Sequence, residues 1–162
     1  MAQQIVIGVD GSAASLDALG AAASLAEPAG AQLSVVFVRD PGLAGAVAGL
    51  ESQGEAVVLQ TEDELGAAAR ERTFDALSEK HVEWTFDVVT GDAAHELLNL
   101  AKRRRAALIV VGGRRHTTIG GVVLGSVAQK LLHISPISVL VVRQPAPDRP
   151  ARSPGSEAVF PG

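Results

Sequence analysis

Short apolar runs that alternate with helix-like segments constrain this 162-residue chain more than any other feature of its sequence. A strand that is apolar along its whole length is buried on both faces, as parallel strands are when helices cover the sheet. Parallel strands need crossover connections, and such crossovers are right-handed. The pattern therefore predicts a doubly wound, Rossmann-like α/β domain with a five-stranded parallel sheet and helices on both faces. The predicted strands are Ile5–Val9, Leu33–Val38, Val82–Val89, Ala107–Val111 and Ile137–Val142.

The segments between these runs carry recognisable helix boundaries. Asp10-Gly11-Ser12 forms a turn that can cap a helix, and Pro28 and Gly30 end the pattern that follows. Segment 43–60 is rich in Ala, Gly and Val, and we expect it to be only partly helical. Capping-box spacing of Thr61 and Glu64 predicts that a helix begins there. The predicted helices run from Ser12 to Pro28, Thr61 to Glu79, Asp92 to Arg105 and Ser126 to His133.

A change in composition divides the chain in two. Residues 144–162 contain five of the eight prolines and few apolar side chains. Such a segment cannot bury enough surface to offset the entropy of ordering it. We therefore expect a folded domain over residues 1–143 and a disordered, Pro-rich tail over 144–162.

Composition also narrows the classes of function. The chain has no cysteine, a formal net charge of −4 and no uninterrupted apolar run long enough to span a membrane. We expect neither nucleic acid nor a membrane as a partner, and without a secretory signal at the start we expect a cytoplasmic protein. We expect no metal site, because the histidines lack ligand spacing; they are His81, His95, His116 and His133.

A glycine-rich stretch after the fourth run carries the strongest chemical signal. It runs from Gly112 to Gly125 and is followed at once by Ser126-Val127. Glycines at the end of a strand let the backbone turn tightly, and the free N–H groups at a helix start favour a phosphate. The alternative is an ordinary loop followed by a serine that only caps its helix.

Four segments together resemble the universal stress protein family, and the resemblance covers Gln4 to Arg143. They are Ile5-Val6-Ile7-Gly8-Val9-Asp10-Gly11-Ser12, Gly91-Asp92-Ala93, Leu108–Gly112 with the glycine loop and Gly125-Ser126-Val127, and Ser135–Val142. The resemblance implies a strand order of 3-2-1-4-5 and a homodimer joined through the last strand, Ile137–Val142. It also implies a role in the stress response without catalytic turnover.

The nucleotide-binding members of that family carry Gly, two residues, Gly, nine residues, then Gly and Ser or Thr. Gly112 takes the first position here and Gly125-Ser126 takes the last two, but Arg115 replaces the middle glycine. Arginine adds a side chain where the family has none, yet a guanidinium is also a good phosphate ligand. By the same resemblance Asp10 contacts the nucleoside with its carboxylate, and Val38 contacts it with its backbone.

Two functions therefore remain open at this point. In the first, the protein binds an adenine nucleotide (ATP, AMP or cyclic AMP) through Asp10, Val38 and the glycine loop. The site would then comprise Asp10, Val38, Gly112, Arg115, Gly125, Ser126 and Val127. In the second, Arg115 closes the pocket, and the protein is an interaction or scaffold module that binds no nucleotide. We expect no catalytic residue in either case.

Overall fold

The computed structural model of the chain describes residues 2–40, 54–113 and 124–143. Five strands form one parallel sheet in the order β3-β2-β1-β4-β5, which confirms the predicted fold class and strand order. The tail that we predict over 144–162 lies outside the described residues. The strands are β1 (Gln4–Val9), β2 (Gln32–Arg39), β3 (Trp84–Thr90), β4 (Leu108–Gly112) and β5 (Ser138–Val142). The helices are α1 (Ala13–Ala29), α3 (Gly54–Leu77), α4 (Ala93–Arg103) and α5 (Ser126–Ile134).

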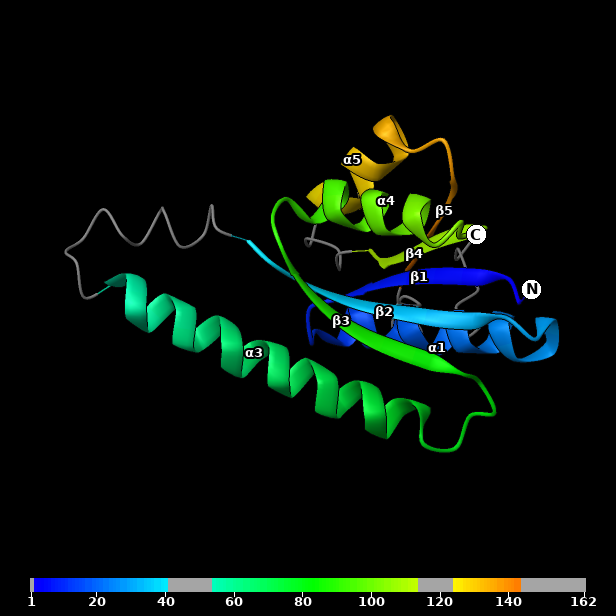
Figure 1. The fold of residues 1–162 in the computed structure, drawn as a ribbon, viewed down its shortest axis with the longest axis horizontal. Helices are drawn as coiled ribbons and strands as arrows, with labels where there is room; N and C mark the ends of the chain where they lie inside the picture. Colours follow the sequence, from blue (N-terminus) through cyan, green and yellow to red (C-terminus); the bar gives the residue numbers. More distant parts are fainter. Residues whose placement is uncertain (1, 41–53, 114–123, 144–162) are drawn as a thin grey trace, which may run out of the picture.

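Helices cover both faces of the sheet, as Figure 1 shows, with α1 and α3 on one face and α4 and α5 on the other. Alternate residues of the central strands supply two separate cores. On β1, Ile5, Ile7 and Val9 pack with α1 and α3, whereas Val6 packs with α4 and α5. Each central strand is therefore apolar on both sides, and for this reason its sequence is an uninterrupted run of apolar residues.

The loop from β1 into α1 begins the helix as the sequence predicts. Ser12 is the N-cap residue, and its side chain accepts a hydrogen bond from the Ser15 N–H at 3.2 Å. Pro28 lies in the last turn of α1, and Gly30 ends the helix in the left-handed conformation, with φ of 59°.

The prediction that the next helix begins at Thr61 is wrong, because α3 begins at Gly54 and ends at Leu77. The residues that α3 buries explain why its sequence shows no clear helical period of apolar side chains. Several of them are small or polar, and they recur every three or four residues: Glu62, Gly66, Ala69, Thr73 and Leu77. Small residues allow close approach; a Cβ on Gly66 would lie only 3.3 Å from the Phe37 ring. A stripe of this kind gives no strong hydrophobic signal.

The basic run at the end of α4 is not simply a solvated face. Lys102 and Arg103 are exposed, but the side chain of Arg104 is half-buried and lies across the sheet. Its Nη2 is 2.8 Å from Asp87 Oδ2 and its Nη1 is 2.8 Å from Thr85 Oγ1, with a further bond to the buried Ser34 hydroxyl. Arg104 thus joins the end of α4 to β2 and β3.

The aromatic residues of β3 pack against the core on the α1 and α3 face of the sheet. Trp84 and Phe86 are half-buried against the α1 and α3 core, while Val88 on the same face is 44% exposed. Phe74 of α3 meets Trp84 edge-on, with ring centroids 6.4 Å apart. The other strands lie within one or two residues of the predicted bounds.

Candidate functional site

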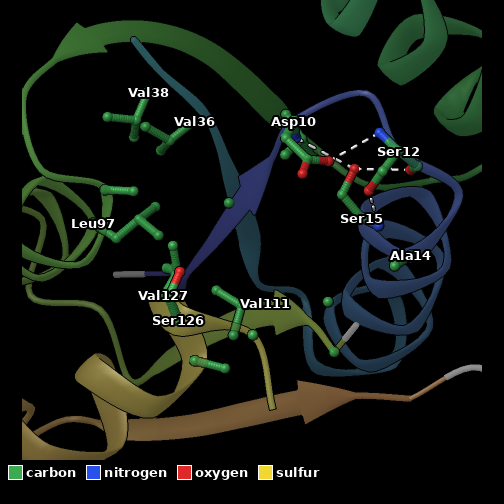
Figure 2. Close-up of a pocket in the computed structure, with 17 residues that line it drawn as sticks. Asp10, Ser12, Ala14, Ser15, Val36, Val38, Leu97, Val111, Ser126 and Val127 are labelled. Carbon is green, nitrogen blue, oxygen red and sulfur yellow. Dashed lines mark hydrogen bonds between the residues drawn. The ribbon is translucent and has the colours of Figure 1, made fainter. Parts of the chain in front are cut away.

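A pocket opens at the carboxyl ends of the strands, between β1 and its two neighbours. The chain passes from β1 to β2 and β3 on one side and returns to β4 and β5 on the other, so the strand order reverses at β1. Ligands of doubly wound sheets bind at such a reversal. The pocket has a volume of about 170 Å³, and its walls come from β1, β2, β4, α1, α4 and α5. Figure 2 shows Asp10, Ser12 and Ser15 on one side of it and Val36, Val38 and Leu97 on the other.

Asp10 is fixed where β1 ends. Its Oδ1 accepts a hydrogen bond from the Ser12 N–H at 2.9 Å, and its own N–H lies 3.3 Å from the Ser15 hydroxyl. Burial raises the pKa of the Asp10 carboxyl, but hydrogen bonds from Ser12 and Ser15 outweigh it and hold that pKa below its usual value. The pocket therefore contains an ionised, oriented acceptor at neutral pH.

Gly112 lets the first turn of α1 cross the end of β4. A Cβ at Gly112 would lie 2.6 Å from the Ala14 carbonyl oxygen and 3.0 Å from the Ser15 nitrogen. Both are backbone atoms, so no side chain can move aside to make room. The glycine is required by this close approach, which brings α1, β1 and β4 together at the pocket.

The first turn of α5 lines the pocket, and its backbone N–H groups have no partner within the helix itself. Gly125 is the N-cap residue, Ser126 is the first helical residue, and no side chain of the described residues caps this end of the helix. This differs from the interpretation of Ser126 as an ordinary N-cap. The helix dipole adds partial positive charge at the same place. By contrast, α1 and α4 are capped by the side chains of Ser12 and Asp92.

Asp92 and Lys130 hold α4 and α5 together beside the pocket. Asp92 Oδ1 accepts from the His95 N–H at 3.1 Å and lies 2.8 Å from His95 Nδ1, while Oδ2 lies 2.9 Å from Lys130 Nζ. The hydrogen bond from Lys130, followed by that from the His95 backbone, lowers the pKa of Asp92 to about 2. This ion pair holds the amino-terminal turn of α5 in position beside Ala93 of α4, which lines the pocket.

The structure brings six of the seven predicted site residues to this pocket. They are Asp10, Val38, Gly112, Gly125, Ser126 and Val127. Arg115 lies outside the described residues. Sequence reasoning missed other lining residues, including Ser15, Val36 and Leu97. Ser15 could have been found from its place three residues after the N-cap Ser12. Val36 and Leu97 look like ordinary core residues in the sequence.

The described residues contain no group of three or more His, Asp or Glu side chains arranged to hold a metal ion. None of the helices they form has the length and apolarity needed to cross a bilayer.

Proteins of known family are similar to this chain in sequence and in fold. A curated relative, universal stress protein YxiE of Bacillus subtilis, is 32% identical over 148 residues, covering 88% of this chain and all of that protein. The structure of the universal stress protein UspA from Lactobacillus plantarum superposes with a TM-score of 0.69, at 23% identity over 87% of this chain and 97% of that one. A universal stress protein solved in complex with cAMP is 28% identical, with a TM-score of 0.57 over 88% and 97% of the two chains. The family model described as the universal stress protein family matches residues 1–143, and this chain therefore belongs to that family.

Proposed function

We propose that this protein binds an adenine nucleotide in the pocket at the carboxyl edge of its sheet and acts, without catalytic turnover, as a homodimeric stress-response module in the cytoplasm. One observation carries the proposal. The uncapped start of α5 and the ionised carboxylate of Asp10 open onto the same pocket. A nucleotide has the complementary pair of groups, an anionic phosphate and a sugar and base rich in hydrogen-bond donors.

The charges that line the pocket determine where each end of the nucleotide lies. Phosphate oxygens accept from the N–H groups of Ser126 and Val127, where the helix dipole is favourable. Asp10 repels a phosphate and is placed to accept hydrogen bonds from hydroxyl or amino groups of the nucleoside. The apolar side chains of Val36, Val38 and Leu97 line the rest of the pocket, and they suit a flat base.

The relative in complex with cAMP supports an adenine ligand, because it shares 28% of its sequence with this chain over 97% of its own length. Three related ligands serve as probes: cyclic AMP, AMP and ATP. Isothermal titration of the full chain should give saturable heat with at least one of them. Denaturing the purified protein and identifying the released nucleotide by mass gives an independent test. No heat with any of the three contradicts the proposal.

The sequence leaves a competing function open. Arg115 stands where nucleotide-binding relatives have a glycine, so its side chain either closes the pocket or binds the phosphate. The Arg115→Gly variant separates these roles. Creation or strengthening of ATP binding shows that arginine blocks the pocket, and the protein is then an interaction module. Weakened binding shows that Arg115 is a phosphate ligand.

The homodimer is proposed through β5. This strand pairs with β4 on one edge, and its other edge is free within the described part of the chain. Val139 and Val141 pack against one core, and Leu140 and Val142 against the other, yet all four stay partly exposed. Pairing of two such edges would remove an aggregation-prone strand from solvent. Sedimentation equilibrium should give twice the monomer mass at micromolar concentration, and a monomer mass throughout that range contradicts the dimer.

The absence of turnover is tested separately. Incubation with ATP and Mg²⁺ should release neither AMP nor phosphate at a rate above about one per minute, well below the typical enzyme range of 1–1000 s⁻¹. Rapid release that is lost in Asp10→Asn would instead identify an enzyme.

A further inference from the structure

We propose that a groove at the opposite, amino-terminal edge of the sheet binds an extended acidic peptide segment of a partner protein. The groove lies at the starts of β1, β2 and β3, whereas the proposed nucleotide pocket lies at their carboxyl ends. It has a volume of about 1120 Å³. The two sites share no lining residue, so this inference does not depend on the proposed nucleotide.

Arg105, which lines the groove, adopts a backbone conformation that arginine disfavours. Its φ is 52°, and among the described residues no other residue except glycine has a positive φ. It follows the last turn of α4, where the Ala106 N–H donates to the Ala101 carbonyl at 2.8 Å and glycine is the usual residue. The Arg105 side chain is exposed and makes no hydrogen bond or ion pair within the described part of the chain. A cation here complements the dipole of α4, but the backbone conformation favours glycine, and the exposed guanidinium remains available to a ligand.

Arg104 supplies a second guanidinium to the same groove. Its bonds to Ser34, Thr85 and Asp87 hold it rigidly. Lys102 and Arg103 lie just before it, exposed and without partners among the described residues. Glu83 is the one carboxylate that lines the groove in that part of the chain, and it accepts a hydrogen bond from Gln32. The four basic residues 102–105 thus outnumber the two carboxylates beside them, Glu83 and Asp87, although the whole chain carries a net charge of −4.

The remaining lining favours a peptide over a small inorganic anion. Val82 and Trp84 provide apolar surface, and the exposed amide of Gln3 can bond to a peptide backbone. The volume of the groove far exceeds that of a phosphate ion. A carboxylate of a bound segment would pair with Arg105, whose guanidinium has no partner in the described part of the chain, and apolar side chains of the segment would cover Trp84.

The single tryptophan makes the site directly observable. Trp84 is the only tryptophan of the chain and lines this groove, so its fluorescence reports binding there and not at the other edge. The probe is an acetylated, amidated octapeptide of alternating Glu and Leu, titrated into the full chain. The matched peptide has Gln in place of Glu. We expect saturable binding of the Glu peptide, at least ten-fold weaker binding of the Gln peptide, and weakening by added NaCl.

Two variants test the role of Arg105 itself. Arg105→Gly removes the guanidinium at a position where glycine fits the backbone, so the variant should fold. It should bind the Glu peptide at least ten-fold more weakly. Arg103→Ala, which removes an exposed cation outside the groove, should change affinity less than three-fold. Equal binding of the Glu and Gln peptides, unchanged binding by Arg105→Gly, or an equal loss in Arg103→Ala would overturn the proposal. A single-stranded RNA octamer that binds more tightly than the Glu peptide would also overturn it, in favour of a nucleic-acid site.

Discussion

Lys130 Nζ lies 2.9 Å from Asp92 Oδ2, and this ion pair joins α5 to the start of α4 beside the pocket. The Asp92 carboxyl has a pKa of about 2, lowered from 3.8. A carboxyl whose pKa is lower in the folded protein stabilises the fold above its unfolded pKa. That contribution is lost as the pH falls from about 4 towards 2.

We predict that Asp92→Asn destabilises the protein at pH 7 and not near pH 2. Asparagine caps helices as well as aspartate does, so the substitution removes the charge and keeps the cap. The Asp92 side chain is 49% exposed, and solvent screening limits the loss to about 0.5–1 kcal/mol. Urea unfolding at pH 7, 4 and 2.5 measures the difference from the parent chain. In the Lys130→Met background, Asp92→Asn should change the free energy of unfolding only slightly. A loss of stability as large as in the parent chain would show that Lys130 is not the partner of Asp92.

Gly112→Ala should destabilise the fold by about 2–3 kcal/mol and lower Tm by roughly 10 °C. The added Cβ would lie 2.6 Å from the Ala14 carbonyl oxygen, and the backbone of α1 must move to relieve this contact. Gly20→Ala is the matched control in α1, because nothing lies within 4 Å of a Cβ there. That variant should gain about 0.5–1 kcal/mol from better helix propensity. Equal effects of the two substitutions in calorimetry would refute the close approach.

Asp10→Asn should weaken cyclic AMP binding about ten-fold, the effect expected when one hydrogen bond to a charged group becomes a neutral one. Its unfolding free energy should change by less than about 1 kcal/mol, since asparagine can still accept from the Ser12 N–H. Asp17→Asn, at an exposed position on α1, is the control and should bind as the parent does. Unchanged affinity in Asp10→Asn, measured by titration calorimetry, would remove Asp10 from the site.

Arg105→Gly should raise the unfolding free energy by about 0.5–1 kcal/mol, because glycine adopts a φ of 52° without the Cβ penalty. Arg103→Gly, two residues earlier in helical conformation, should lower it by a similar amount. The opposite signs of the two changes distinguish a backbone effect from the loss of a positive charge. If both variants are destabilised in urea, Arg105 stabilises the fold through contacts of its own.

Most of this fold could be predicted from the sequence, because its central strands are apolar on both faces. Such runs are visible without knowledge of tertiary structure, and they placed Asp10, Val38 and Gly112 at strand ends that meet at one edge. The start of α3 could not be predicted, since Gly66 and Ala69 pack by being small and leave no apolar period. The bonds of Arg104 to strands far away in sequence were equally invisible, because the run of basic residues at a helix end already had a local explanation in the helix dipole.

The hydrogen bonds that hold the turn from Asp10 to Ser15 are all made within the protein. They fix the carboxylate during folding, so the entropy of ordering that side chain is lost once, with the rest of the chain, and not again at each binding event. A preorganised acceptor of this kind cannot reshape itself around a poor ligand. Selectivity at this end of the pocket should therefore come from the fit of donors to a fixed oxygen, and a nucleoside analogue with one displaced donor should lose affinity without inducing any compensating movement of the turn.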